Sequence, residues 1–230
     1  MKYSIVGEAM QSLKITLDNG EKIYSDSGKL VFKSMNITMT PKIAGGIVKA
    51  IMRKATGATA MLTEFASSGN GEVVSVAGVF PGKIKMLELD EGEVFIAEDH
   101  AFLAAHESVD FSIQMVSLGA AFFGGAGLVL QRFTGPGTVF IHVVGDIIEY
   151  DLDGSKSIEV DPYHIAGFTG GLSYNIRFVD NLRTAVFGGV GIFLATFKGS
   201  GKLILHSVSR AKLSSEIYIA GQQASNGDKR

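Results

Sequence analysis

Two stretches of this chain repeat one pattern of phenylalanine, glycine and histidine at a fixed distance. Residues 123–142 read FGGAGLVLQRFTGPGTVFIH, and residues 187–206 read FGGVGIFLATFKGSGKLILH. His142 recurs as His206, 64 positions later, and eight other residues of the first stretch recur at the same spacing. So regular a recurrence indicates tandem copies of one supersecondary unit.

The repeat extends upstream of these stretches. Residues 95–113 align with residues 158–176, and residues 62–73 match residues 130–139 more weakly, with one residue inserted. We therefore predict three units over residues 1–88, 89–152 and 153–220, followed by a frayed polar tail over residues 221–230. Because one unit alone cannot bury its apolar face, we expect the three to share one core with pseudo-threefold organisation.

The composition favours short strands. Glycine is abundant (29 residues) and proline is scarce (4), while valine, isoleucine and phenylalanine are frequent, which is typical of strands joined by tight turns. The formal net charge of −2 gives no overall attraction to nucleic acid. Cysteine is absent, which excludes disulfides, and the first residues lack the apolar run of a signal peptide. These features predict an all-β protein of the cytoplasm.

A hairpin is predicted near the start of the chain. Leu13, Ile15 and Leu17 alternate with polar residues and are followed by Asn19-Gly20. Alternation that ends in Asn-Gly is a strong signal for two paired strands.

Residues 111–131 carry no formal charge over about the length of a membrane span. Glycines and polar residues interrupt this stretch, and its repeat partner contains charged residues. We therefore predict buried strands joined by a glycine turn rather than a transmembrane helix.

One segment breaks the β pattern. Apolar residues between positions 44 and 54 fall at helical spacing, and a glycine follows at position 57. The basic residues on its other side are Lys49, Arg53 and Lys54. We predict a short amphipathic helix that caps an open end of the β core. The alternative is a basic surface for anionic lipid or RNA, for which three cations are few.

The equivalent histidines His142 and His206 are the main candidates for a metal site. Such histidines can converge on one ion in a pseudosymmetric protein, but the first unit has a valine near that position. We therefore interpret both as strand-end residues that hydrogen bonds satisfy, and we predict no metal, no cofactor and no catalytic residue. The candidate polar surface comprises Lys49, Arg53, Lys54, His142 and His206. The acids Glu98-Asp99 and Asp161 share a turn of the repeat. We interpret them as turn caps, with weak binding of a cation as the alternative.

Glycine motifs superficially suggest phosphate or dinucleotide binding. Gly199-Ser200-Gly201-Lys202 lacks the glycine and the hydroxyl residue of a phosphate loop, because Thr196 and Leu203 occupy those positions. No helical pattern follows the Gly-Gly pairs, as a dinucleotide fingerprint requires. We interpret these glycines as turns or bulges. The predicted structural turns are Gly124, Gly125, Gly135, Gly137, Gly188, Gly189, Gly199 and Gly201.

The order of the motifs resembles a known family. The stretches that carry the resemblance are residues 11–25 (QSLKITLDNGEKIYS), 49–57 (KAIMRKATG), 81–105 (PGKIKMLELDEGEVFIAEDHAFLAA), 160–168 (VDPYHIAGF) and 197–201 (FKGSG). Together they make nearly the whole chain similar to the mitochondrial-biogenesis family, also called altered inheritance of mitochondria.

This resemblance implies a fold like that of the tryptophan RNA-binding attenuation protein. The expected architecture is three copies of a short double-stranded β-helix-like sandwich, with protomers in a ring and a trimer favoured. The family supplies no catalytic residues. Many relatives have glutamate after the second glycine of the Gly-Gly turn, where this chain has Ala126 and Val190.

These observations favour a non-enzymatic scaffold or interaction protein. It is expected to form a homo-oligomer whose glycine-rich apolar turns meet a protein partner or a membrane surface. The alternative, by analogy with the attenuation protein, is binding of RNA or of a small ligand. RNA is less favoured, because the available cations are scattered along the chain: Lys83, Lys85, Arg132, Lys198, Lys202 and Arg210. An enzyme is the last hypothesis, with His100, His142, His164 and His206 as its candidate residues.

Overall fold

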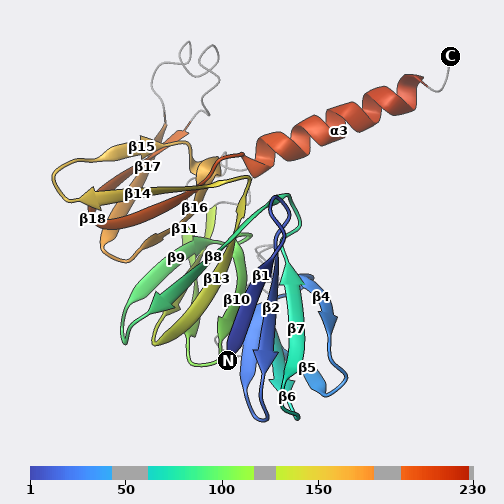
Figure 1. The fold of residues 1–230 in the computed structure, drawn as a ribbon. Coiled ribbons are helices and arrows are strands. Elements are labelled where there is room, and N and C mark those ends of the chain that lie inside the picture. The colour runs from blue at the N-terminus through green and yellow to red at the C-terminus, as the bar shows by residue number, and fades with distance from the viewer. Residues whose placement is uncertain (43–61, 117–127, 179–192, 228–230) are drawn as a thin grey trace.

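Antiparallel sheets make up most of the structure (Figure 1). The computed structural model describes residues 1–42, 62–116, 128–178 and 193–227. Within these residues the chain is mostly β, with several antiparallel sheets, one of them curled as a half-barrel, and with one α-helix. The predicted all-β fold is confirmed. The helix predicted over residues 44–54 lies outside the described residues.

The strands fall into three successive groups along the chain. The first group comprises β1 (Lys2–Val6), β2 (Ser12–Leu17), β3 (Lys22–Asp26), β4 (Leu30–Lys33), β5 (Ile37–Lys42), β6 (Leu62–Ser67) and β7 (Glu72–Ala77). The second comprises β8 (Gly82–Leu89), β9 (Val94–Glu98), β10 (Phe102–His106), β11 (Asp110–Val116), β12 (Leu128–Thr134) and β13 (Gly137–Val144). The third comprises β14 (Ile147–Asp153), β15 (Ile158–Val160), the 3₁₀ turn η2 (Pro162–His164), β16 (Ile165–Thr169), β17 (Leu172–Phe178) and β18 (Phe193–His206).

The same strand pairing occurs in all three groups. In the second group β8 and β10 pair with β13, and β9 and β11 pair with β12. In the first group β2 and β4 pair with β7, and β3 and β5 pair with β6. In the third group the long strand β18 replaces both β12 and β13, and it pairs with β14, β15, β16 and β17. The sequence repeat thus corresponds to a recurring pairing pattern, and the unit boundaries predicted above stay a prediction.

Neighbouring groups are joined edge to edge. β10 pairs with β3 of the first group, and β16 pairs with β9 of the second. Each junction fuses two half-sheets, which gives the strand orders β5-β6-β3-β10-β13-β8 and β11-β12-β9-β16-β18-β14. The first group also keeps a separate sheet with the order β1-β2-β7-β4.

The hairpin predicted around Asn19-Gly20 is wrong, because its two strands enter different sheets. β2 pairs with β1 and β7, whereas β3 pairs with β6 and β10. The turn closes on itself through the Glu21 N–H, which donates to the Asp18 carbonyl oxygen (3.0 Å), and it also bonds to another turn. The Asn19 N–H donates to the Asn70 side chain (3.0 Å), and the Asp18 carboxylate accepts from the Gly71 N–H (2.9 Å). Three consecutive residues of β3 are buried, so both of its faces need cover that β2 cannot provide.

The uncharged stretch of residues 111–131 contributes to two strands. β11 and β12 pair antiparallel along their whole length. The turn predicted at Gly124 and Gly125 lies outside the described residues, as does the corresponding turn at Gly188 and Gly189. In the part of the chain that the structure describes, no helix is long and apolar enough to cross a membrane.

The remaining predicted glycine turns lie at one repeated position. Gly135 follows β12 and Gly137 begins β13, with a φ of +138° at Gly137. Gly199 and Gly201 lie inside β18, which continues through them with φ values of +106° and +157°. Residues with a side chain avoid such φ values, which accounts for glycine at this position in both groups.

A helix that the sequence analysis did not predict closes the chain. α3 spans Arg210–Gly227 and includes residues 221–227 of the predicted polar tail. Ser209 caps its start, because the Ser209 Oγ accepts a hydrogen bond from the Lys212 N–H (3.4 Å). Residues 214–221 are exposed, and Figure 1 shows the helix extending away from the sheets. A helix with so little packing needs no apolar stripe, which is the signal that sequence analysis depends on.

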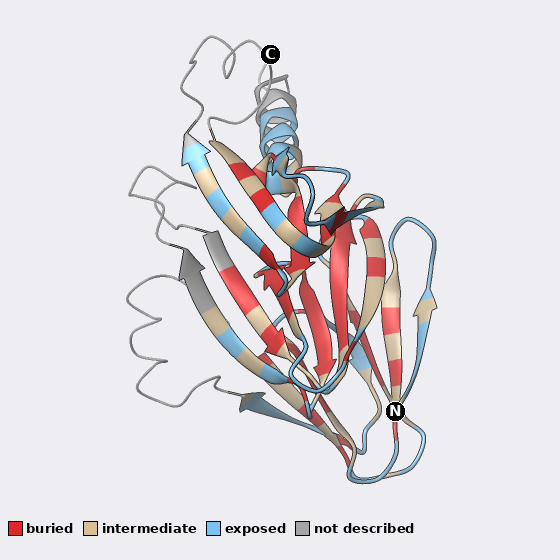
Figure 2. Cartoon of the chain, turned by 90° about the vertical axis from the view of Figure 1, so that its left-hand side faces the viewer, coloured by how far each residue is buried: buried red, intermediate tan, exposed pale blue. Residues whose placement is uncertain are grey.

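The core runs through the junctions between groups (Figure 2). Tyr24 of the first group packs beside Phe102 of the second, with ring centroids 5.7 Å apart, and Phe102 lies 4.7 Å from Phe133. The Tyr24 hydroxyl donates to the Val109 carbonyl oxygen (2.9 Å). The same cluster includes Ile204 of the third group. No group therefore has a core of its own.

We expect Phe102→Ala to lower the free energy of unfolding by about 3 to 5 kcal/mol, because it leaves a cavity in this shared cluster. Phe102 is 0% exposed, whereas Tyr150 on β14 is 45% exposed. Tyr150→Ala is the matched control and should cost much less. Chemical denaturation monitored by circular dichroism measures both, and equal losses would contradict a core that crosses the junctions.

Candidate functional site

A cavity of about 200 Å³ lies where the three strand groups meet. Its charged and polar lining comes from all of them: Lys29 from the first group, Glu98, His100 and His142 from the second, and His206 and Arg210 from the third group and α3. Val79, Phe80 and Val144 complete the lining. Charged groups from distant parts of the sequence thus share one small, largely buried space.

Lys29 brings a buried cation into this cavity from the turn between β3 and β4. Its side chain is only 7% exposed, and its Nζ donates to the His100 carbonyl oxygen (3.1 Å) and lies 3.9 Å from the Asp26 carboxylate. Burial lowers the pKa of Lys29, which the charge of Asp26 opposes. Burial also raises the pKa of Asp26 to about 6. Each charge therefore stays in the interior with help from the other.

Glu98, at the end of β9, faces the first residue of α3. Its Oε1 accepts from the Arg210 guanidinium (3.0 Å), and its Oε2 accepts from the His100 N–H (3.1 Å). Burial raises the pKa of Glu98 well above its usual range, and the neighbouring Asp99 raises it further, while Arg210 opposes both. The pair ties the start of α3 to the second strand group.

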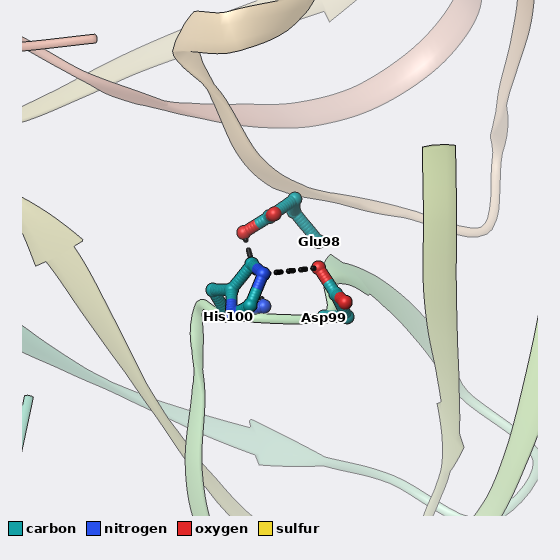
Figure 3. Close-up of side chains that lie close together, drawn as sticks. All are labelled: Glu98, Asp99 and His100. Carbon is teal, nitrogen blue, oxygen red and sulfur yellow. Dashed lines mark hydrogen bonds and ion pairs between the residues drawn. The ribbon is translucent and has the colours of Figure 1, made fainter. Parts of the chain in front are cut away.

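Glu98, Asp99 and His100 form the one described group of side chains close enough to share a cation (Figure 3). Their potential ligand atoms lie within 4.8 Å of one another, and the His100 imidazole is 3.6 Å from the Asp99 carboxylate. However, Arg210 and a backbone N–H already occupy the Glu98 oxygens. A metal ion would have to displace these donors and share the space with Lys29, so the arrangement does not favour one.

His142 and His206 also line the cavity and are only 3% and 4% exposed, so neither contributes to the polar surface predicted for them. His206 Nδ1 accepts from the Val144 N–H (2.9 Å), as predicted for that residue. Burial lowers the pKa of His142 to about 4 and that of His206 to about 3. Both rings are therefore neutral near pH 7 and can donate or accept a hydrogen bond there.

Other predicted polar residues do not join this site. Lys49, Arg53 and Lys54 lie outside the described residues. His106 bonds to the Ser108 hydroxyl (2.7 Å) at the edge of the molecule, and His164 bonds through Nδ1 to the His206 carbonyl oxygen (2.7 Å). Of the four histidines considered for an enzyme, His100, His142 and His206 line the cavity, and His164 lies beside it through its bond to the His206 backbone.

Acids neutralise most of the cations considered for RNA binding. Lys85 and Lys202 both bond to Glu149 (2.6 and 2.9 Å), and Lys83 lies 3.8 Å from Asp146. Lys202 also lines a second, open groove of about 700 Å³ between the second and third groups. Hydrogen bonds to its acids raise the pKa of Lys202. Paired cations of this kind have little charge left for a phosphate backbone.

Sequence analysis missed Lys29 and did not connect Glu98 with Arg210. Strand register places one acid at the same point of each group, directly after or at the end of β3, β9 and β15. A cation lies near each acid, in the pairs Asp26–Lys29 (3.9 Å), Glu98–Arg210 (3.0 Å) and Asp161–Lys212 (3.9 Å). The recurring acid was visible in the alignment of the repeats. The cation that pairs with it lies at a different distance along the sequence in each group.

Comparison with known proteins gives a consistent family assignment. A family model described as mitochondrial biogenesis AIM24 matches residues 3–208. An uncharacterised protein of Streptococcus pyogenes serotype M6 is 29% identical over 205 residues, which cover 86% of this chain and 81% of that protein. A crystal structure of a Streptococcus pyogenes protein from a structural genomics programme superposes with a TM-score of 0.79 at 25% identity, over 95% of this chain and 99% of that one.

The buried histidines predict a specific loss of stability in acid. Above pH 6.5 each histidine is neutral in both the folded and the unfolded chain, and below pH 6.5 only the unfolded chain takes up the proton until the folded pKa is reached. For His206 this costs about 2 kcal/mol of unfolding free energy between pH 7 and pH 5. The raised pKa values of Asp26 and Glu98 act in the opposite sense, since the folded protein binds those protons first.

We therefore expect His206→Gln to lose about 2 kcal/mol less than the natural protein on going from pH 7 to pH 5. Urea titrations at the two pH values measure the difference, from which the carboxyl contributions cancel. His106→Gln, outside the cavity, is the matched control. The same pH dependence in the His206 variant and the natural protein would show that His206 titrates normally in the fold.

Proposed function

Because this chain belongs to the mitochondrial biogenesis family AIM24, and because its exposed apolar side chains lie on its first and third strand groups, we propose that it is a non-enzymatic scaffold or interaction protein. In this proposal it forms a ring-like homo-oligomer, with a trimer favoured, as the family resemblance implies. A protein partner or a membrane surface is its further target, and a cytoplasmic location is part of the same proposal.

The distribution of exposed apolar side chains carries the proposal. The first group and the third group with α3 expose large apolar residues, among them Val31 (56%), Met35 (93%) and Ile217 (59%). Among the residues of β8 to β13 whose exposure the structure describes, which exclude positions 114–116, 128 and 129, no large apolar side chain reaches the same exposure. The middle group has neighbours on both sides and the outer groups have one each. Unfilled apolar surface at the two ends of a chain is typical of a protein that binds partners there.

A second candidate function, binding of a small polar ligand, is favoured by the cavity at the meeting of the three groups. Lys29 and Arg210 offer cations, and the neutral imidazoles of His142 and His206 offer hydrogen bonds. A volume of about 200 Å³ is below the range usual for drug-sized ligands, so the ligand would have to be a small one. RNA is less supported, since Glu149 and Asp146 pair with several of the cations.

Native mass spectrometry of gently purified protein tests both proposals at once. The scaffold proposal expects one discrete oligomer whose mass is a whole multiple of the 24.4 kDa chain, without retained small-molecule mass. A retained mass that Lys29→Met removes would favour the ligand-binding candidate instead. A monomer at every protein concentration would overturn the assembly part of the scaffold proposal.

Co-sedimentation with neutral and anionic vesicles tests the membrane target. Protein that stays in the supernatant with both vesicle types would remove the membrane from the proposal and leave a protein partner.

A further inference from the structure

The two internal junctions of the chain are built in one way. At the first, β10 pairs with β3, with Ala104, Ala105 and His106 opposite Ser25, Tyr24 and Ile23. At the second, β16 pairs with β9, with Gly167, Phe168 and Thr169 opposite Ala97, Ile96 and Phe95. The two junctions have the same register. β10 and β16 are equivalent strands, because β10 pairs with β13 and β16 with β18 in the same way, each with a bulge after its first residue.

β4 is the strand of the first group that corresponds to β10 and β16. It has the same bulge, between Leu30 and Phe32, in its pairing with β7. Its other edge pairs with no strand in the described part of the chain. Likewise β15 corresponds to β3 and β9, and among the described residues it pairs only with β18. One free edge of each kind therefore remains, at opposite ends of the chain.

Residues at the free edge of β4 are exposed, whereas the equivalent residues of β10 and β16 are buried. The bulged residue is 0% exposed in β10 (Leu103) and in β16 (Ala166), but Val31 in β4 is 56% exposed. The residue before the bulge is 0% exposed in β10 and 2% exposed in β16, whereas Leu30 is 37% exposed. Phe32 is also 46% exposed. A strand edge that is both unpaired and apolar is a template for another strand.

The composition of the sheets also shows that one junction is missing. Each internal junction completes a sheet from two halves, for example β5-β6-β3 with β10-β13-β8. The half-sheet that contains β4 and the half-sheet formed by β15, β18 and β17 have no such counterpart among the described residues. They are the two missing halves of one further junction, and Figure 1 shows them at opposite ends of the molecule, so one chain cannot bring them together.

We propose that a second copy of this chain supplies the missing half, with β4 of one copy paired antiparallel to β15 of the next. This rests on the proposed function, since it names the partner and the strands of the homo-oligomer. The register of the internal junctions places Phe32 opposite Val160, Lys33 opposite Glu159 and Ser34 opposite Ile158. The central pair is therefore a cation facing an acid, which favours this pairing over one between two identical edges.

Exposure of the central pair fits such a contact. Lys33 forms no ion pair within the described residues, and its Nζ donates only to the nearby Ser34 carbonyl oxygen (3.3 Å). Glu159 is 44% exposed and holds Arg177 at 2.8 Å, which leaves its second carboxylate oxygen available to Lys33 of another copy. The contact is head to tail, so repeated copies close a ring or extend a filament.

Cysteine cross-linking tests the pairing directly, because the natural chain has no cysteine. Opposed antiparallel residues have Cα atoms roughly 4.5 to 5.5 Å apart, close enough for a disulfide or a short bismaleimide. We expect an equimolar mixture of Lys33→Cys and Glu159→Cys proteins to give a covalent dimer on mild oxidation. Each variant alone should give none, since a head-to-tail contact never brings two copies of one edge together.

The outcomes separate this inference from the proposed function. Cross-linking of Lys33→Cys with itself would overturn the head-to-tail pairing in favour of a symmetric contact. An oligomer in native mass spectrometry without mixed cross-linking would overturn the β4–β15 pairing and leave the homo-oligomer standing. A monomer without cross-linking would overturn both.

A charge in the exposed edge gives an independent measurement on a folded protein. Val31→Glu should weaken self-association at least tenfold by sedimentation velocity, because the carboxylate would be buried at the junction, while the melting temperature of the monomer stays close to the natural value. Met39→Glu on β5, 43% exposed and away from this edge, is the matched control and should associate normally. Equal association of both variants would contradict the proposal.

Discussion

This structure depends on one interaction. It is the backbone hydrogen bonding between the bulged strand of one group and the free edge of the group before it. β10 on β3 and β16 on β9 convert half-sheets into larger sheets and bring the faces of neighbouring groups together. The shared aromatic cluster around Phe102 exists only because the first junction holds Tyr24 beside it. A bulge normally bends a strand and increases its twist, so its recurrence at Leu103 and Ala166 sets the same local geometry at both junctions.

The charged cavity is a consequence of that geometry. An acid ends β3 and β9, and each junction buries the acid on its inner side, where a charge needs a partner. Lys29 serves Asp26 from within its own turn, while Arg210 reaches Glu98 from the start of α3. The ion pair between Arg210 and Glu98 anchors α3, which has few other contacts with the protein. The two buried histidines complete the lining as neutral hydrogen-bonding groups rather than as charges.

Much of the fold could be predicted from the sequence, because glycine and alternation patterns report turns and strands locally. The repeat pointed to a recurring pairing pattern, and the hydrogen-bonded role of His206 was anticipated. The hairpin at Asn19-Gly20 failed because a turn signal cannot say whether its two strands stay in one sheet. The site was out of reach for a similar reason: Lys29 and Arg210 meet Glu98 only through strand register, and α3 has no apolar periodicity because it buries little.

The identical register of the junctions also has a consequence for the chain while it is being synthesised. A nascent chain that has emerged only as far as β7 exposes the β3 edge, and one that has emerged as far as β13 exposes the β9 edge. Both edges match β4 of a neighbouring nascent chain on the same messenger as well as they match their own next strand. The residue that would face Lys33 is Tyr24 in β3 and Ile96 in β9, and only the last edge offers Glu159. The charge of Glu159 thus distinguishes the edge of β15 from the temporarily exposed edges of β3 and β9. This distinction matters most where ribosomes are closely spaced on one messenger.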